Sequence, residues 1–335
     1  MKVAFFSAKS HEQDAFEALG SDHDFTYLDE RLTEDTATRA TGHRAVCVFA
    51  NDVIDAGVIH ALSRAGVEVI ALRCTGCNHV DFDAAAETGM RVVHVPAYSP
   101  HAVAEHAVAL MMAVIRQVPR AANRVRIGNY ALHGLTGFDV VGKTVGVIGT
   151  GRIGTAFARI LKQGFGARVL AHDPWPNDAC REMGVEYVPL DTLLRQSDII
   201  SLHCPLNEES HHLIDAAAIA AMKPGVVLVN TARGGVIDTA AAIDGLKQER
   251  IGALALDVYE KEGPLFFRDR SDEILQDDQF ARLLAFPNVL VTGHQAFLTR
   301  EALEQIAKQT VGNLDCIENG LACEREITPP DVSAD

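Results

Sequence analysis

The sequence lacks the long uncharged hydrophobic runs, the excess of basic residues and the paired cysteine motifs that mark several large classes of protein. No uncharged apolar stretch reaches the roughly 18 residues that a membrane-spanning helix needs. The opening residues MKVAFFSAK show no long apolar segment with a cleavage site. The formal net charge is -15, which disfavours a nucleic-acid backbone or an anionic membrane as the main partner. We therefore expect a cytoplasmic protein that binds a small molecule.

Cysteine is sparse and dispersed, with 7 residues in a chain of 335. An odd, scattered set of this kind predicts reduced thiols. Cys74 and Cys77 form one C-x-x-C pair, but a second pair and a nearby His-x-x-x-His are both missing. We interpret the pair as chance spacing in preference to a redox motif, and we expect no metal site.

Short apolar, β-branched runs alternate with helical patterns along the chain. Hydrophobic residues make up 48% and charged residues 22%, which is typical of globular proteins. Such alternation predicts parallel sheets with helices on both faces. The expected strands are 2–6, 45–49, 68–72 and 91–95 in the first part, and 144–149, 167–173, 197–203, 225–230, 251–258 and 288–293 in the second.

Two helices organise these strands into domains. One long apolar helix begins at Pro100, extends to about residue 125 and separates the two series. An amphipathic helix from about Thr299 to Leu321 is expected to fold back on the first sheet. The predicted fold is α/β, with two doubly wound parallel-sheet domains. Their expected boundaries are 1–99 plus 297–335, and 100–296.

A glycine motif indicates the cofactor. Gly149, Gly151 and Gly154 form G-x-G-x-x-G between a predicted strand and a predicted helix. The first glycine permits the tight turn, the second lets a pyrophosphate approach the backbone, and the third lets the helix pack closely. Asp173 ends the next strand, 19 residues after Gly154. Its carboxylate would accept hydrogen bonds from ribose hydroxyls and repel a 2′-phosphate, so NAD is favoured over NADP.

Side chains of different chemistry follow three predicted strands of the second series. Arg233 follows the predicted strand 225–230, and His294 follows the predicted strand 288–293. Asp257 lies near the end of the predicted strand 251–258, and Glu262 comes shortly after it. Taken alone, each of these residues is explained equally well by a functional role and by a plain structural role. The structural roles are a surface ion pair for Arg233, a loop charge for Glu262 and a strand cap for His294. Because ligands bind beyond the carboxyl ends of parallel strands, their coincidence at one edge favours an active site.

The chemistry of these groups suits hydride transfer to a 2-keto acid. Arginine offers a planar fork for the carboxylate and carbonyl oxygens. Histidine delivers a proton near neutral pH, and a neighbouring glutamate stabilises the imidazolium. NAD carries the hydride. We expect Gly234 and Gly235, directly after Arg233, to let the backbone pass close to the nicotinamide.

Several long motifs resemble those of the D-isomer-specific 2-hydroxyacid dehydrogenases. They are GTGRIG, HDPWP, SLHCPL, MKPGVVLVNTARGGVID, ALDVYE, the insertion PLFFRDRSDEILQDD, VTGHQAFLT, ALRCTGCNHVD and VPAYSPHAVAEHA. The resemblance covers nearly the whole chain. It implies a flavodoxin-like substrate domain, a Rossmann NAD-binding domain, an active-site cleft between them, and a homo-oligomer, either dimer or tetramer.

The resemblance also implies roles for individual residues. Arg233 resembles the substrate-orienting arginine, His294 the acid/base, and Glu262 its carboxylate partner. The implied cofactor-binding residues are Gly149, Gly151, Arg152, Ile153, Gly154, Asp173, Cys204, Pro205, Ser210, Thr231, Ala232, Arg233 and Asp257. Ser210 departs from the Thr or Asn that often stands there. Asp257 resembles the acid near the nicotinamide carboxamide.

The expected substrate pocket draws on the first domain. Thr75, Gly76 and Cys77 resemble the carboxylate-binding loop, although relatives often have Phe or Val in place of Cys77. Tyr98, Phe49 and Phe297 resemble pocket residues, and three aromatic side chains favour a methyl group. Phe49 is equally well explained as ordinary core. The expected reaction is the reduction of pyruvate to D-lactate by NADH.

The sequence is also compatible with two further functions. Another 2-keto acid, such as a branched-chain keto acid, hydroxypyruvate or glyoxylate, is the first alternative substrate. A corepressor-like protein that binds NAD as a sensor is a remote alternative. Among the remaining histidines, we expect His211 and His212 at the surface, His106 in packing and His203 near the cofactor cleft.

Overall fold

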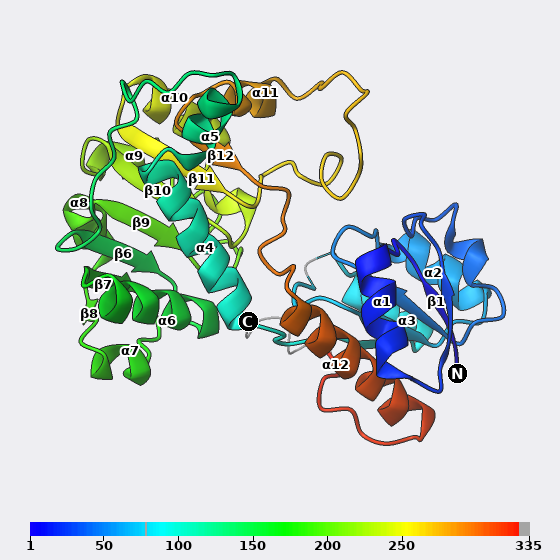
Figure 1. Ribbon diagram of the computed structural model, residues 1–335. Helices are drawn as coiled ribbons and strands as arrows, with labels where there is room; N and C mark the ends of the chain where they lie inside the picture. The colour runs from blue at the N-terminus through cyan, green and yellow to red at the C-terminus, as the bar shows by residue number, and fades with distance from the viewer. Residues whose placement is uncertain (78, 328–335) are drawn as a thin grey trace. The chain divides into compact units, whose positions relative to one another are not determined.

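The computed structural model describes residues 1–77 and 79–327. Contacts between Cα atoms divide the chain into two compact units (Figure 1). The first unit comprises Met1–Ser99 with Leu298–Asp335, and the second comprises Pro100–Phe297. Each unit is built around its own sheet, and each is described separately below.

The first unit contains a parallel sheet in the order β2-β1-β3-β4-β5. Its strands are β1 Lys2–Phe5, β2 Asp24–Tyr27, β3 Ala45–Val48, β4 Val69–Leu72 and β5 Arg91–Val93, and its helices are α1 Ser10–Leu19, α2 Ala56–Arg64, α3 Phe82–Thr88 and α12 Arg300–Glu318, with a 3₁₀ turn at Ala37–Ala40. Every residue of β3 and β4 is buried, as central strands of a doubly wound sheet require. This strand order is that of flavodoxin-like folds.

Local sequence explains where these helices begin and end. Asp55 and Asp81 cap α2 and α3 by accepting the N–H groups of Val58 and Ala84 at 2.9 Å. The segment after α12 returns to the sheet, where Glu326 forms a bridge with Val93. Together with the contacts of α12 against α1 and β4, this bridge joins the carboxyl-terminal segment to the first unit.

The second unit contains a parallel sheet in the order β12-β11-β10-β9-β6-β7-β8. Its strands are β6 Thr144–Ile148, β7 Arg168–His172, β8 Glu186–Tyr187, β9 Ile199–Leu202, β10 Val226–Asn230, β11 Ile251–Leu256 and β12 Val289–Val291. Its helices are α4 Pro100–Ile115, α5 Val118–Arg126, α6 Arg152–Arg159, α7 Asp178–Glu182, α8 Leu190–Gln196, α9 Ala216–Ala221, α10 Thr239–Lys247 and α11 Asp278–Leu284. The order is that of a Rossmann sheet with one added strand, and it reverses between β6 and β9.

Both faces of this sheet are covered. Along β10, Val226 and Leu228 join one apolar cluster, whereas Val227 and Val229 join the other. Figure 1 shows α4 running across the sheet, and α4 contacts α6, β10 and β11. Because both faces are buried, side chains that bind a ligand must come from the strand ends.

The sequence analysis was wrong about one helix and missed two strands. The long helix after Pro100 is two helices, α4 and α5, bent by 61°. The bend falls where Gln117 has φ 51 and Pro119 removes a backbone donor. Strands β2 and β8 were not expected from the sequence. β2 has no buried residue and β8 has two residues, so neither carries a strong apolar pattern.

Among residues 1–77 and 79–327, no single helix is long and apolar enough to cross a membrane, and only the bent pair α4–α5 meets the criteria of length and composition together.

Candidate active site

The turn between β6 and α6 has the geometry that its glycines predict. Gly149 has φ 90, and a Cβ there would lie 2.6 Å from the backbone carbon of His203. A Cβ on Gly154 would lie 2.0 Å from the carbonyl oxygen of Gly149. These two positions therefore require glycine for reasons internal to the fold. Gly151 differs, because a Cβ there would meet nothing within 4 Å.

Gly151 is also the N-cap of α6 and makes no side-chain capping bond. The N–H groups of the first helical turn lack carbonyl partners within the helix, and Arg152 is exposed while Ile153 packs against the apolar cluster below. The one glycine that the packing does not require thus stands where a ligand phosphate would approach backbone donors.

Asp173 stands directly after β7 and interacts with the glycine turn. Its Oδ2 accepts hydrogen bonds from Thr150 N at 2.5 Å and Thr150 Oγ1 at 3.0 Å, and its Oδ1 accepts one from Trp175 N at 2.8 Å. The carboxylate therefore fixes the turn. A carboxylate oxygen can accept more than one hydrogen bond, so Asp173 retains acceptor capacity for a ribose hydroxyl.

The segment after β9 forms the other side of the point where strand order reverses. Burial raises the pKa of Cys204 to about 11, so this thiol stays protonated near neutral pH. Ser210 is buried, and its hydroxyl donates to Pro205 O at 2.6 Å and accepts from Asn207 N at 2.8 Å. Ser210 thus closes the loop that carries Pro205, and its hydroxyl is used within that loop.

Arg233 leaves β10 on a turn that a buried asparagine holds. Asn230 Nδ2 donates to Arg233 O at 2.9 Å, and Asn230 Oδ1 accepts from Ala232 N at 2.9 Å. The Arg233 side chain is half-buried and donates from Nη1 to Ala232 O at 2.8 Å. No motif in the sequence singled out Asn230. A polar residue ending the apolar run VVLVN was the available signal, because a buried amide needs partners.

The glycines after Arg233 also have a reason within the fold itself. A Cβ on Gly234 would lie 2.1 Å from the backbone carbon of Tyr259 and 2.3 Å from Glu260 N. Gly235 packs against the Leu206 side chain, 3.1 Å from the position of a Cβ. Gly234 therefore allows the turn of Arg233 to pack directly against the loop after β11.

The loop after β11 places Glu262 in contact with His294. Glu262 Oε1 lies 2.8 Å from His294 Nδ1, and Glu262 Oε2 accepts from Tyr259 N at 2.9 Å. His294 has φ 54, a left-handed backbone conformation that costs energy in a non-glycine residue. The carboxylate fixes Nδ1 of His294, so Nε2 is the ring nitrogen that could serve a second partner.

Asp257 holds the loop of His294 from below. Its side chain is fully buried and accepts from Thr292 Oγ1 at 2.5 Å, Gln295 N at 2.9 Å and Ala296 N at 2.8 Å, while its carbonyl oxygen accepts from His294 N at 2.7 Å. Burial opposes its charge, but these hydrogen bonds and one from His106 lower the pKa of Asp257 below its ordinary value. Asp257 is therefore an ionised anchor for the segment that positions His294.

His106 contributes to the same anchor from α4. Its Nε2 lies 3.1 Å from Thr292 Oγ1 and 3.4 Å from Asp257 Oδ1. The sequence suggested only packing for this histidine, because nothing along the chain relates α4 to the end of β12.

In the first unit, predicted substrate residues follow neighbouring strands. Thr75, Gly76 and Cys77 come after β4 and are half-buried, and Phe49 comes directly after β3. Phe49 and Cys77 both pack against the apolar core of that unit, which agrees with Phe49 as an ordinary core residue. Tyr98 is half-buried beyond β5, and Phe297 is buried at the end of the second unit.

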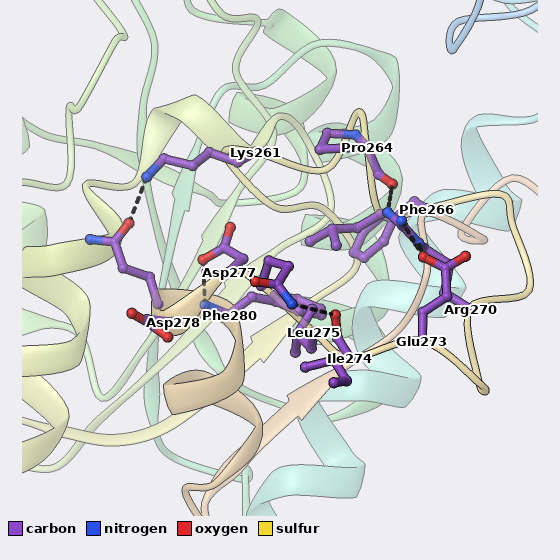
Figure 2. A pocket seen from close by; sticks show the side chains of 13 residues that line it. Lys261, Pro264, Phe266, Arg270, Glu273, Ile274, Leu275, Asp277, Asp278 and Phe280 are labelled. Carbon is purple, nitrogen blue, oxygen red and sulfur yellow. Dashed lines mark hydrogen bonds and ion pairs between the residues drawn. The ribbon is translucent and has the colours of Figure 1, made fainter.

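The insertion after Glu262 encloses a hollow of 640 Å³ (Figure 2). Two of its cationic lining groups have partners within the lining, since Lys261 Nζ donates to Gln279 Oε1 at 2.9 Å and Arg270 pairs with Glu273. Arg233, Glu262 and His294 are not among the residues that line it. The hollow is thus separate from the cluster at the strand ends.

Comparisons with known proteins agree with this geometry. The family model "D-isomer specific 2-hydroxyacid dehydrogenase, NAD binding domain" matches residues 108–296. The chain belongs to the D-isomer specific 2-hydroxyacid dehydrogenases. A curated relative, "D-lactate dehydrogenase" from Escherichia coli (strain K12), is 52% identical over 329 residues, which cover 98% of this chain and 100% of the relative.

Two solved structures of the family are similarly close. The apo-structure of D-lactate dehydrogenase from Escherichia coli has a TM-score of 0.89 at 49% identity, covering 98% of this chain and 100% of that one. The pyruvate reductase of Chlamydomonas reinhardtii has a TM-score of 0.92 at 46% identity, covering 97% of this chain and 98% of that one. This dehydrogenase is therefore an NAD-dependent oxidoreductase of two α/β units.

The residues present fit NAD. Besides the open position at Gly151, two buried polar atoms, Thr231 Oγ1 and His203 Nδ1, have no hydrogen-bond partner among residues 1–77 and 79–327. His203 follows β9, at the reversal of strand order, and Thr231 follows β10, the strand beside it. In open α/β sheets, dinucleotides bind at this point. A bound cofactor would give such atoms the partners that buried polar groups normally have.

Proposed function

We propose that the protein is an NAD-dependent D-lactate dehydrogenase, which catalyses pyruvate + NADH + H⁺ to D-lactate + NAD⁺ in a reversible reaction. The observation that carries the proposal is the 2.8 Å hydrogen bond between Glu262 and His294 at the carboxyl edge of a Rossmann sheet, with Arg233 leaving the same edge. The names of the relatives, D-lactate dehydrogenase and pyruvate reductase, support lactate and pyruvate as the substrate pair.

Three side chains divide the work in this proposal. Arg233 binds the substrate carboxylate and the carbonyl oxygen through its planar guanidinium. His294 donates a proton from Nε2 to the carbonyl oxygen as that oxygen gains negative charge, and it takes the proton back in the reverse direction. Glu262 keeps the imidazole ring in this orientation and stabilises its protonated form. NADH, when bound, supplies the hydride.

The second unit would hold NAD through its glycine turn and the strand ends around it. Gly149, Gly151, Arg152, Ile153 and Gly154 would hold the pyrophosphate, and Asp173 the adenosine ribose. Cys204, Pro205, Thr231 and Ala232 would line the nicotinamide side, with Ser210 closing the loop of Pro205. Asp257 would act mainly through the loop that it anchors.

The remaining assignments are also proposals. The first unit would act as the substrate domain, with Thr75, Gly76 and Cys77 presenting backbone N–H groups to a carboxylate and Tyr98, Phe49 and Phe297 limiting the side chain. We further propose a fermentative role in the cytoplasm and a homo-oligomeric state. Sedimentation of the purified protein would test the last of these.

The first experiment is the initial rate of NADH oxidation with millimolar pyruvate near neutral pH, with an enantiomer-specific assay of the product. Fast turnover to D-lactate is expected. A panel of branched-chain keto acids, hydroxypyruvate and glyoxylate would follow, and a preference for one of these would replace pyruvate as the substrate. Binding of NADH without turnover of any keto acid would contradict an enzymatic role and favour an NAD sensor.

A further inference from the structure

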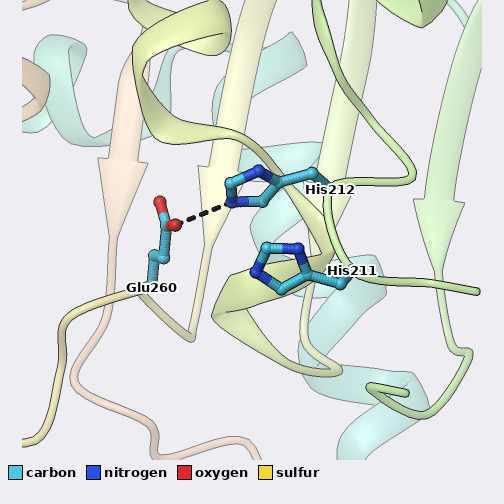
Figure 3. Close-up of side chains that lie close together, drawn as sticks. All are labelled: His211, His212 and Glu260. Carbon is cyan, nitrogen blue, oxygen red and sulfur yellow. Dashed lines mark hydrogen bonds and ion pairs between the residues drawn. The ribbon is translucent and has the colours of Figure 1, made fainter. Parts of the chain in front are cut away.

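Two histidines and a glutamate gather on the second unit, apart from the groups used above. His211 and His212 lie in the segment after β9, and Glu260 lies in the loop after β11 (Figure 3). One potential ligand atom from each of the three side chains lies within 4.8 Å of the other two. His212 Nε2 and Glu260 Oε1 are 2.7 Å apart.

Neighbouring residues in a chain rarely direct their side chains to one point, so the backbone here is informative. His212 has φ 52, and its N–H donates to Gly235 O at 2.8 Å. This left-handed turn brings its ring alongside that of His211, with the ring centroids 4.0 Å apart and the planes at 24°. Figure 3 shows a nitrogen of each ring on the side of Glu260.

The third side chain is held just as firmly. The backbone of Tyr259 and Glu260 packs against Gly234, and Glu260 Oε2 lies 3.4 Å from Thr239 N. Two loops that leave different strands are thus fixed on each other. A site whose ligands are already gathered loses little conformational freedom when it binds an ion.

We propose that His211, His212 and Glu260 bind a Zn²⁺ ion, with the remaining position open to water. Two imidazole nitrogens and one carboxylate oxygen are a donor set that Zn²⁺ uses in proteins. Ligands around a tetrahedral zinc ion lie about 3.3 Å from each other, as follows from bonds of roughly 2.0–2.1 Å. The candidate ligand atoms lie within 4.8 Å of one another, and the two stacked rings would have to rotate apart for a nitrogen of each to reach that value.

The sequence indicated no such site, because His211 and His212 lack the spacing of a helical or zinc-finger motif. A half-buried ion pair of His212 with Glu260, with His211 as a surface ring stacked upon it, would account for the same geometry without a metal. The metal site and the ion pair differ in what the exposed His211 does, so His211 is the residue to change.

The experiment measures Zn²⁺ binding to the full chain by equilibrium dialysis, together with the shift of the thermal midpoint that Zn²⁺ causes. Because the seven cysteines can also bind Zn²⁺, the measured quantity is the difference between variants. His211→Ala should lose one Zn²⁺ per chain or bind it at least ~10–100-fold more weakly. The Zn²⁺-dependent rise of several degrees in thermal midpoint should be lost with it.

Two further variants serve as controls. His133→Ala removes an exposed histidine of the same unit and should bind Zn²⁺ like the unaltered protein. His211→Gln keeps a polar side chain, and should behave like His211→Ala if the imidazole is a ligand. Equal stoichiometry and affinity in the unaltered protein and both His211 variants would overturn the proposal and leave the cluster as an ion pair with a stacked ring.

Discussion

Among single residues, His294 has the geometry of a proton donor. Its Nδ1 is held by Glu262 at 2.8 Å, and its own N–H is fixed to Asp257 O at 2.7 Å. His294→Gln keeps a side chain of similar reach but cannot transfer the proton. We expect kcat to fall by about 10²–10⁴, the usual contribution of general acid catalysis, in steady-state assays with pyruvate and NADH.

The matched control for this variant is His101→Gln, which changes an exposed histidine of the same unit and should leave kcat unaltered. A loss smaller than about tenfold in His294→Gln would contradict its role as proton donor. It would then leave the short contact with Glu262 as a structural ion pair.

Arg233 allows a test of geometry at constant charge. The guanidinium of Arg233 presents two parallel donors, whereas the ammonium of Arg233→Lys is a point charge. We expect kcat/KM for pyruvate to fall by roughly 10–100-fold, since a hydrogen bond to a charged group contributes about 1.5–3 kcal/mol. Affinity for NADH, measured by fluorescence titration, should change less than kcat/KM for pyruvate, although the resemblance also counts Arg233 among the cofactor-binding residues. Unchanged kinetics with pyruvate would remove Arg233 from the substrate site.

At the scale of secondary structure, apolar runs predicted the buried strands well. The strands β3, β6 and β10 lie within one residue of their expected ranges because residues on both of their faces pack into a core. Edge strands such as β2 and β8 carry no such pattern. The bend between α4 and α5 depends on Gln117 and Pro119, a local feature that apolar periodicity does not report.

In the candidate site, too, the sequence predicts some features and does not reveal others. Side chains that directly follow strands, such as Arg233 and His294, could be predicted from the sequence, because the carboxyl ends of parallel strands all lie at one edge of the sheet. Asn230 was missed although its contact with Arg233 is local. The sequence predicted Asp257 as a site residue but not its hydrogen bond to the loop of His294, and it missed the role of His106, because both contacts join segments that are distant in sequence. No spacing along the chain encodes those contacts.

One contact between such loops gives a prediction for the element that carries Glu262. A methyl group at Gly234 would lie 2.1 Å from the backbone carbon of Tyr259, and backbone cannot rotate away as a side chain can. Gly234→Ala should displace the loop of Glu262, lower kcat, and reduce the free energy of unfolding by about 1–3 kcal/mol. Activity assays and urea denaturation would measure the two effects.

Gly312→Ala is the control for a glycine that packing does not require. It lies within α12, and a Cβ there would meet nothing within 4 Å. Alanine should stabilise this helix slightly, by up to ~1 kcal/mol. If Gly234→Ala behaved like Gly312→Ala, the close packing of the Arg233 turn on the loop after β11 would be contradicted.

For the molecule as a whole, the cofactor turn lies against His203, a partly buried histidine whose ring nitrogens are enclosed. His203 lies against Gly149 and Gly154, its ring packs on Phe157 with centroids 4.9 Å apart, and its Nε2 is 2.9 Å from Ser201 Oγ. Burial lowers the pKa of His203 from 6.5 to about 3. The folded protein therefore keeps this imidazole neutral at pH values where an unfolded chain would protonate it.

The sign of the effect follows from proton linkage. Below about pH 6.5 the unfolded chain binds a proton at His203 that the folded chain does not bind, until the pH approaches the folded pKa of about 3. Stability should thus fall as the pH falls through this interval, by at most about 1.4 kcal/mol per pH unit for one group. His203→Asn should lower stability at pH 7 by leaving a cavity, yet show a shallower decline between pH 6.5 and pH 4.5. Thermal midpoints across that range would give the slope for the unaltered protein, for His203→Asn and for His133→Asn, which changes an exposed histidine as a control. Parallel slopes in all three proteins would show that His203 does not govern acid stability.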